Sequence, residues 1–442
     1  MRSVLMLCYY YPPLGGIGSQ RSQKFAFYLP DYGWRPIVLT PAKGSYLVDH
    51  SLDDGASRGI EIVRTGYLDL SSMFKRAVPN GKSANGSDGK AGAPETGTIV
   101  EFMRRSVRNW LYVPDGQIGW YPYAIGAGRR ALEMSGADLI YSSSFPVTAH
   151  LAARKLKQAT GKPWVADFRD LWTQNHYNEY TSAFRKRIDQ MMESGLLEAA
   201  DVLVTVTNEW AGTLRKLSGG RKRVEVIRNG FDAGEFASIE RRRPEKWTIT
   251  YVGTFYGAKQ DPTAVFDALR RLLNTGQVKE TEVHMKIVGE PDAYVQEIVG
   301  RLGLGGITSF TGFVPHHQSL AHQVESSLLL LILHGDKSNP GVVPGKLYEY
   351  LGARRPIMAI MPAEFEAARL IRETRAGVIV DGSNAAEIDR CLIDSYAAHK
   401  SNAAYSASEC DLSPYERKQG AQQLADIFSD CLNEQGLRSL QT

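Results

Sequence analysis

The sequence predicts an α/β protein built from two Rossmann-like halves, and three observations support this. Short strand-like runs alternate with longer helical patterns, which is typical of a parallel sheet covered on both faces. The same alternation begins again at residue 247. Between the two series lies a polar, charged stretch with turn signals, residues 228–246. A chain of 442 residues is also too long for one core, so two or three domains are expected.

The first half, residues 1–228, carries continuous apolar runs that predict strands. They lie at residues 3–8, 36–40, 138–143, 163–168 and 201–206. Helical patterns separate several of them, for example residues 22–33 and 149–161. One segment, residues 79–98, is rich in Gly, Ser, Asn and Lys and has no large apolar side chain, so we expect a mobile loop there.

The second half, residues 247–412, repeats this pattern after a predicted linker at 229–246. Its predicted strands are residues 247–253, 283–289, 327–333, 356–361 and 377–380. Residues 413–442 are expected to form a C-terminal helix, because Ser413 and Pro414 resemble a helix start and apolar residues follow at helical spacing.

Composition narrows the class of protein. The chain is 43% hydrophobic and 23% charged, as is ordinary for a soluble protein, and its longest aliphatic run is far shorter than the ~20 residues of a membrane span. The N-terminus lacks a signal-peptide cleavage pattern and is expected to be a first strand. The four scattered cysteines predict reduced thiols in a cytoplasmic protein. A net charge of +4 does not indicate nucleic-acid binding.

A glycine-rich loop, "YYYPPLGGIGSQRS", follows the first predicted strand. Its Gly15, Gly16 and Gly18 would let backbone N–H groups approach an anion, with the start of the next helix adding positive potential. The alternative is a tight turn without a ligand, since the loop lacks the full GxGxxG pattern.

The second half has a denser pattern of the same kind. Residues 251–262 place two glycines and Lys259 just after a strand. Further on, Pro344 suits the first turn of a helix, and Lys346 and Glu349 share one helix face. A helix start with a lysine suits a diphosphate, and a carboxylate one turn deeper can accept hydrogen bonds from ribose hydroxyls. The alternative is a weak ion pair on a solvated face.

Eight short motifs, in this order, resemble those of a known family. They are "YYPPLGGIGSQR", "GWRPIVLT", "DFRDLW", "RNGFD", "YVGTFYGAK", "IVGEPD", "TGFVPH" and "VPGKLYEYLGARRPI". Together they resemble the GT-B glycosyltransferases of the large retaining family 4, in particular the subset that builds bacterial surface polysaccharides. The resemblance implies two Rossmann-like domains that face each other across a cleft, with a C-terminal helix crossing back to the N-domain.

The resemblance also implies roles for single residues in a donor-binding site. Gly16 matches the glycine whose backbone faces the donor diphosphate, and Lys259 matches a lysine that contacts it. Glu349 matches the glutamate that holds the nucleotide ribose. The backbone of Phe313 and Val314 matches the segment that meets the base. The adjoining Gly15, Gly341, Val342 and Lys346 complete the predicted donor site.

Three positions depart from the family pattern. Gly341 stands where the family usually has a glutamate facing the donor sugar, and Thr254 stands where it has a diphosphate-binding arginine. Arg169, in "DFRD", replaces the histidine of the catalytic region. We take Arg169 and the adjacent Asp170 as candidate catalytic residues, and we expect Asp115 to face the acceptor hydroxyl.

The stretch 102–124 combines Arg104, Arg105 and Arg108 with aromatic residues. One interpretation is an interfacial patch near a lipid-linked acceptor, because basic and aromatic residues suit an anionic membrane surface. The other is an amphipathic helix that packs on the protein.

The expected activity is therefore a hexosyltransferase-type reaction from a nucleotide-sugar donor to an acceptor hydroxyl. The resemblance implies a lipid-linked saccharide acceptor in exopolysaccharide, capsule or O-antigen synthesis, at the inner face of the plasma membrane. No cofactor and no metal is expected, since the nine histidines lack metal-ligand spacing and no Asp-x-Asp pair occurs. Two alternatives remain at this point: a GT-B sugar-nucleotide epimerase, and a non-catalytic nucleotide-sugar-binding protein.

Overall fold

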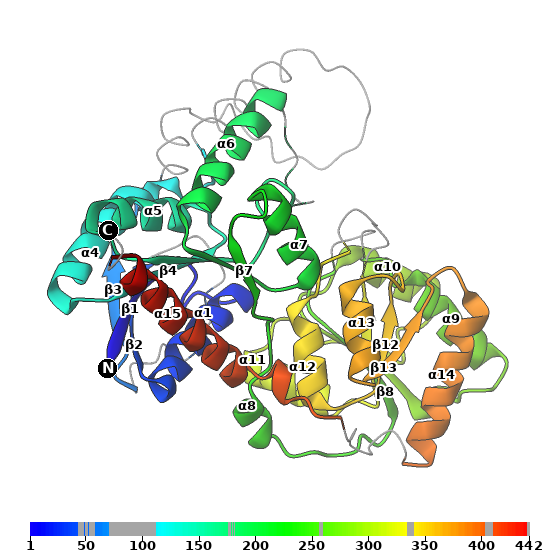
Figure 1. Cartoon of the computed structure of the whole chain (residues 1–442). Coiled ribbons are helices and arrows are strands. Elements are labelled where there is room, and N and C mark those ends of the chain that lie inside the picture. The colour runs from blue at the N-terminus through cyan, green and yellow to red at the C-terminus, as the bar shows by residue number, and fades with distance from the viewer. Residues whose placement is uncertain are drawn as a thin grey trace. The chain divides into compact units, whose positions relative to one another are not determined.

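The structure is a computed structural model. In it the chain folds into two compact units (Figure 1). It describes residues 1–42, 48, 52, 58–69, 112–175, 178, 180, 182–255, 260–333, 340–402 and 410–439. The N-unit consists of Met1–Val206, Ala211–Glu225 and Leu424–Thr442. The C-unit consists of Thr207–Trp210 and Val226–Gln423.

The N-unit is built on a seven-stranded sheet with the order β3-β2-β1-β4-β5-β6-β7. Its strands are β1 (Arg2–Cys8), β2 (Trp34–Pro41), β3 (Glu61–Thr65), β4 (Leu139–Ser144), β5 (Trp164–Phe168), β6 (Val202–Thr205) and β7 (Arg223–Val226). Neighbouring strands from β3 to β6 pair in parallel.

Helices connect and cover these strands. They are α1 (Ile17–Tyr28), the 3-10 turns η1 (Leu29–Tyr32) and η3 (Ile118–Trp120), α4 (Tyr121–Ser135), α5 (Thr148–Thr160), α6 (Ala183–Ala199) and α7 (Asn208–Leu217). The C-terminal helix α15 (Arg417–Ser439) adds Phe428 to this core, where its ring lies 5.2 Å from Trp34. A segment from the far end of the sequence therefore completes the N-unit.

The C-unit holds a six-stranded parallel sheet with the order β10-β9-β8-β11-β12-β13. Its strands are β8 (Trp247–Val252), β9 (Val283–Val288), β10 (Thr308–Phe310), β11 (Leu328–Ile332), β12 (Ile357–Ile360) and β13 (Gly377–Val380). Its helical elements are α8 (Ala233–Ala237), α9 (Thr263–Asn274), η5 (Glu280–Glu282), α10 (Ala293–Arg301), α11 (His316–Val324), α12 (Gly345–Ala353), α13 (Glu366–Glu373), α14 (Ala385–Lys400) and η7 (Ser413–Tyr415).

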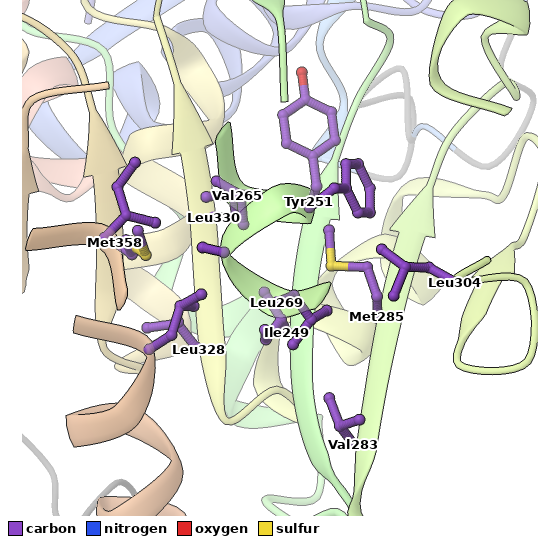
Figure 2. Packing of buried hydrophobic residues seen from close by; sticks show 14 of the residues in the cluster. Ile249, Tyr251, Val265, Leu269, Val283, Met285, Leu304, Leu328, Leu330 and Met358 are labelled. Carbon is purple, nitrogen blue, oxygen red and sulfur yellow. The ribbon is translucent and has the colours of Figure 1, made fainter. Parts of the chain in front are cut away.

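Helices cover both faces of the C-unit sheet, and β11 shows why its sequence is continuously apolar. Leu328 and Leu330 point into a core formed with α9, α10 and α14, which Figure 2 shows from close by. Leu329 and Leu331 point into a second core formed with α11, α12 and α13. Because side chains alternate between the two faces of a strand, a strand buried on both sides needs apolar residues at every position.

The predicted fold class is confirmed: two parallel α/β sheets form two Rossmann-like units. All ten predicted strands are present, with ends shifted by at most two residues. The sequence did not reveal β3, β7 and β10, which are all edge strands with partly exposed side chains. The predicted linker 229–246 contains α8, whose buried Phe236 packs in the core beside α12. In the part of the chain that the structure describes, no helix has both the length and the apolar character needed to cross a bilayer.

Candidate functional site

Each sheet has a point where the order of its strands reverses beside its first strand. In the N-unit this point lies between β1 and β4, and in the C-unit between β8 and β11. The connections leave in opposite directions there, which opens a crevice at the carboxyl ends of the two strands. Ligands of open α/β sheets bind at such crevices.

Lys346 lies at the crevice of the C-unit, in the first turn of α12. Its Nζ donates a hydrogen bond of 3.0 Å to Tyr251 Oη and lies 4.2 Å from the centre of that ring. An ideal Cβ on Gly253, just after β8, would lie 2.8 Å from Nζ, so a side chain there would displace the lysine. Burial lowers the pKa of Lys346 to about 8, although the charge of Glu349 opposes this. A bound anion would favour the charged form of this lysine and raise its pKa again.

The start of α12 adds backbone donors beside this lysine. Its N-cap is Pro344, which makes no side-chain capping bond, and no acidic residue lies in the first turn. The first amides of a helix have no partner within the helix and carry positive potential. Together with Lys346 they form a site suited to a diphosphate.

Glu349, one turn further along α12, is held in a buried polar cluster. Its Oε2 accepts a hydrogen bond of 3.0 Å from Gln323 Nε2, and its Oε1 lies 3.8 Å from His316 Nδ1. His316 also contacts Glu235 of α8, with Nε2 and Oε2 3.4 Å apart. Burial lowers the pKa of His316, but the hydrogen bond to Glu235 and the charge of Glu349 outweigh it and raise the pKa above its usual range. These contacts fix the orientation of the Glu349 carboxylate, and the residue is only 9% exposed.

The predicted base-binding segment follows β10 and leads into α11. Phe313 is 50% exposed, whereas Val314 packs against the core on the α12 face of the sheet. The segment is tied to the crevice by a bridge between Gly312 and Gly289, the residue after β9. Predicted donor-site residues from β10, α11 and α12 thus belong to one carboxyl-end edge of the C-unit.

Gly341 has no room for a side chain. An ideal Cβ would lie 2.7 Å from Cδ1 of Trp210 and 2.9 Å from Cβ of Glu209, so the space of a family-type glutamate is filled. Val342, the next residue, is half-buried. Thr254, where the family has an arginine, is exposed just after β8. Lys259 lies outside the described residues.

The glycine loop of the N-unit follows β1 and opens α1. Gly16 is the N-cap of α1 and has a φ of 86°, a backbone conformation that favours glycine. Gly15 is buried, and Gly16 is exposed. The structure therefore has a glycine turn where one was predicted. Because the N-cap is a glycine, the N-terminus of α1 has no side-chain cap.

A buried ion pair fixes α1 to the sheet. Arg21 donates two hydrogen bonds to Asp167 of β5, from Nε to Oδ2 at 2.9 Å and from Nη2 to Oδ1 at 3.0 Å. Tyr141 adds a hydrogen bond of 2.6 Å to Oδ2. Burial alone would raise the pKa of Asp167, but Arg21 and Tyr141 lower it below its usual value. Sequence analysis missed this pair, although the motifs "GSQR" and "DFRD" each contain one member.

Arg169 lies beside the glycine loop. Its Nε donates to the carbonyl of Ser144 at 3.1 Å, and its guanidinium lies against Gly18. Asp170 is 3.7 Å from the same Nε and is 39% exposed. The structure thus brings the candidate residues of "DFRD" to the carboxyl end of the N-unit sheet.

Asp115, predicted to face the acceptor hydroxyl, is bonded to three local donors. Its carboxylate accepts hydrogen bonds from the backbone N and Oγ1 of Thr148, at 2.9 and 2.7 Å, and from the backbone N of Gln117 at 3.0 Å. These contacts cap the start of α5. A substrate hydroxyl would have to compete with three local donors, so the geometry favours a structural role.

Of the stretch 102–124, the structure describes residues 112–124. Trp120 is completely buried and donates a hydrogen bond of 2.7 Å to Thr65. Arg104, Arg105 and Arg108 lie outside the described residues, as does the predicted loop 79–98. Trp120 therefore packs in the protein core, as the second interpretation expects. Tyr123 of α4, by contrast, is 43% exposed.

The cysteines and the potential metal ligands were also considered in the sequence predictions. All four cysteines are free. Within the described ranges, no three His, Cys, Asp or Glu side chains gather closely enough to hold a metal ion.

Comparison with known proteins gives one domain match and a shared fold. Residues 86–230 match the model of the glycosyl transferase 4-like domain. No curated protein is significantly similar in sequence. The fold resembles sucrose-phosphate synthase of Thermosynechococcus elongatus, with a TM-score of 0.57 and 12% identity over 100% of this chain and 99% of that one.

Two further structures share the fold. HepE of Anabaena, solved with UDP and glucose, has a TM-score of 0.57 and 16% identity over 97% of this chain and 100% of its own. An UDP-N-acetylglucosamine 2-epimerase of Listeria monocytogenes, named as putative, has a TM-score of 0.54 and 11% identity over 98% of this chain and 97% of its own. Residues 86–230 therefore match a glycosyl transferase 4-like domain, and the chain as a whole has the two-domain GT-B fold of these structures.

Proposed function

We propose that the protein transfers a sugar from a nucleotide-sugar donor to an acceptor hydroxyl, with retention of the anomeric configuration and without a metal ion. The observation that carries the proposal is the arrangement of Lys346 and Glu349 at the start of α12. A cationic helix end and a buried, oriented carboxylate one turn apart match a diphosphate and a ribose. UDP is the first nucleotide to test, because HepE was solved with UDP.

Charge on the leaving diphosphate is the main chemical demand of this reaction. In the C-unit, Lys346 and the open amides of α12 would meet it, with Lys259 as a further cation. Such donors are worth more in a site that excludes water. Among the residues that the structure describes, we assign no carboxylate as a nucleophile, and Gly341 lacks the one that the family pattern would supply. We therefore favour departure and attack on the same face of the sugar over a covalent intermediate.

The motifs of the sequence support an acceptor of the bacterial surface-polysaccharide kind, carried on a lipid at the inner face of the plasma membrane. Synthesis of an exopolysaccharide, a capsule or an O-antigen would use such an acceptor. Flotation with anionic vesicles, for wild type and for a variant with Arg104, Arg105 and Arg108 changed to Ser, tests the membrane contact.

A second candidate is favoured by one observation, the likeness to the Listeria protein named as an epimerase. An epimerase acts on the nucleotide-sugar alone, whereas a transferase releases nucleoside diphosphate only when an acceptor is present. A non-catalytic binding protein would release none. Measuring nucleotide release with and without acceptor separates the three.

The site itself is tested by titration with UDP. Glu349→Ala should weaken binding about 10- to 150-fold, since hydrogen bonds to a charged group contribute roughly 1.5–3 kcal/mol. Glu373→Ala, at the last residue of α13, is a matched control that should bind as wild type does. Equal affinity of Glu349→Ala and wild type would remove this residue from the site.

Retention of the anomeric configuration and independence of metal are both tested by NMR of the product formed in the presence of excess EDTA. A product with the donor's anomeric configuration, formed at an undiminished rate, is expected. Activity lost to EDTA and restored by Mg²⁺ would refute the metal-free reaction, and an inverted linkage would refute retention.

A further inference from the structure

His316 lies between two carboxylates that come from different helices of the C-unit. It is the first residue of α11, and its side chain is only 16% exposed. Its Nε2 lies 3.4 Å from Oε2 of Glu235 in α8, and its Nδ1 lies 3.8 Å from Oε1 of Glu349 in α12. All three residues belong to the C-unit. One imidazole ring therefore connects Glu349, which the proposed function assigns to the ribose, with a second carboxylate.

The two oxygens of Glu349 are held in different ways. Oε2 accepts a hydrogen bond of 3.0 Å from Nε2 of Gln323, a residue that is completely buried. Oε1 lies 3.8 Å from the ring of His316, which is close enough for a strong attraction between opposite charges but too far for a hydrogen bond. A carboxylate held at one oxygen can still turn about its last bond. The attraction of His316 for the other oxygen is what selects one orientation.

This attraction requires a protonated imidazole, and the surroundings of His316 favour that form. Burial lowers the pKa of His316, and the positive charge of Arg417 at the start of α15 lowers it further. The hydrogen bond to Glu235 and the charges of Glu349 and Glu235 outweigh both and raise the pKa above its usual range. A neutral ring would leave two carboxylates on either side of it with no cation between them, which is unfavourable because like charges repel.

The place of His316 in its helix argues against a role in stability alone. The N-terminus of a helix carries positive potential and disfavours a cation, and the first turn of α11 contains no acidic residue. Buried ion pairs contribute little net stability, because the cost of removing charges from water offsets their attraction. The cluster is therefore a poor stabilising device, whereas its effect on the orientation of Glu349 is direct.

We propose that His316 is a positioning residue, which in its protonated form, held by Glu235, orients the carboxylate of Glu349 for the ribose hydroxyls of the nucleotide. This inference rests on the proposed function, which places the ribose at Glu349. It gives the ribose contact a pH dependence of its own. Below the pKa of His316 the ring is charged and the contact is fully present. As the pH rises through that pKa the ring loses its proton, and the contact weakens.

The first experiment titrates UDP and 2′,3′-dideoxy-UDP into wild type and His316→Gln. Both ligands carry the same base and diphosphate, so the ratio of their affinities reports on the ribose hydroxyls alone. Wild type should prefer UDP, and His316→Gln should reduce that preference by about tenfold, as expected for coupled neighbours. His317→Gln, which changes the exposed neighbour on the same helix, is the matched control and should keep the wild-type ratio. In a Glu349→Ala background, His316→Gln should add little, because both changes remove one contact.

The second experiment follows the same ratio against pH and compares it with the titration of His316. NMR of the imidazole groups gives that titration, and the resonance of His316 is the one that His316→Gln removes. In wild type the preference for UDP should fall over the pH range in which this resonance titrates. Glu235→Gln should move both changes to lower pH, because the charged ring loses the partner that favours it. His316→Gln should show no such step.

The outcomes separate this inference from the proposed function. An unchanged ratio in folded His316→Gln, or a wild-type ratio that does not follow the titration of His316, would overturn the inference and leave the proposed function standing. Equal binding of the two ligands by wild type would overturn it as well, since no ribose contact would then exist to be oriented. Circular dichroism melting checks the folding of each variant; if His316→Gln does not fold, the wild-type pH series and Glu235→Gln decide. A wild-type protein that binds no UDP would overturn the proposed function itself.

Discussion

Lys346 shows how the surroundings of one residue set its chemistry. Its ammonium lies over the ring of Tyr251 and is largely removed from water, which lowers its pKa to about 8. A bound diphosphate places negative charge beside the ammonium and raises that pKa again. Ligand binding and protonation of Lys346 should therefore be coupled.

We expect UDP affinity to fall as the pH rises from about 8 toward about 10, since an increasing share of the free protein must then take up a proton to bind. Below that window this lysine is already charged and adds no pH dependence. Isothermal titration on either side of pH 8 measures the effect. Lys346→Arg, which stays charged, should bind with less dependence on pH; an unchanged slope in this variant would assign the effect to another group.

Asp115 gives a second prediction for a single residue. If its role is to cap α5, Asp115→Ala should lower the free energy of unfolding by about 0.5–2 kcal/mol, as loss of an N-cap does. Turnover of the folded variant should change little. A loss of about 100-fold or more in kcat with unchanged stability would instead indicate a general base. Urea unfolding and kcat measured on one preparation decide between the two.

At the scale of elements, α1 is joined to β5 by a buried ion pair. Removing one member of such a pair leaves an uncompensated charge inside the protein, which typically costs about 3–5 kcal/mol. Because α1 carries the glycine loop, this pair also positions the N-unit crevice. The pair thus connects the stability of the N-unit to the geometry of its candidate anion site.

Arg21→Met should accordingly lower the urea midpoint of the protein strongly. The double variant Arg21→Met with Asp167→Leu should recover part of the loss, since it removes both charges. Arg129→Met breaks an exposed i,i+4 pair with Glu133 and should cost only about 0.3–0.5 kcal/mol. Equal effects of Arg21→Met and Arg129→Met would show that burial of the Arg21 pair contributes little.

At the scale of the whole molecule, the last helix belongs partly to the first unit. Residues from Leu424 onward cluster with the N-unit, where Phe428 lies 5.2 Å from Trp34 and 5.9 Å from Tyr141, ring centre to ring centre. Trp34 also donates a hydrogen bond of 3.4 Å to Ser429. The N-unit core is therefore incomplete until the end of the chain has been made.

Phe428→Ala should destabilise the N-unit by about 3–5 kcal/mol, the usual cost of emptying an aromatic core position. Leu437→Ala, on the same helix but 63% exposed, is the control and should have almost no effect. Hydrogen exchange of the strands β1, β2 and β4 reports on the N-unit alone. Protection lost equally from the strands of both units would contradict the assignment of Phe428 to the N-unit.

The sequence by itself determined the elements that are buried on both faces. The run that became β11 is apolar at every position, and those that became β1 and β8 are mostly apolar, because a central strand of a covered sheet has no solvent side. The edge strands β3, β7 and β10 were not predicted, since their exposed positions admit polar residues and blur the pattern. Helix α12 and its Lys346 and Glu349 were also predicted, because capping and helical spacing are local properties.

Only the tertiary structure decided which groups meet. Lys346 with Tyr251, Glu349 with Gln323 and Arg169 with Gly18 come from elements far apart in the sequence, and the order of the strands brings them together. The same holds for Asp115, which lies in a loop but accepts a hydrogen bond from the backbone N of Thr148 at the start of α5. Local patterns follow from backbone geometry and side-chain spacing, whereas the partner of a polar group depends on where folding leaves the other segments of the chain.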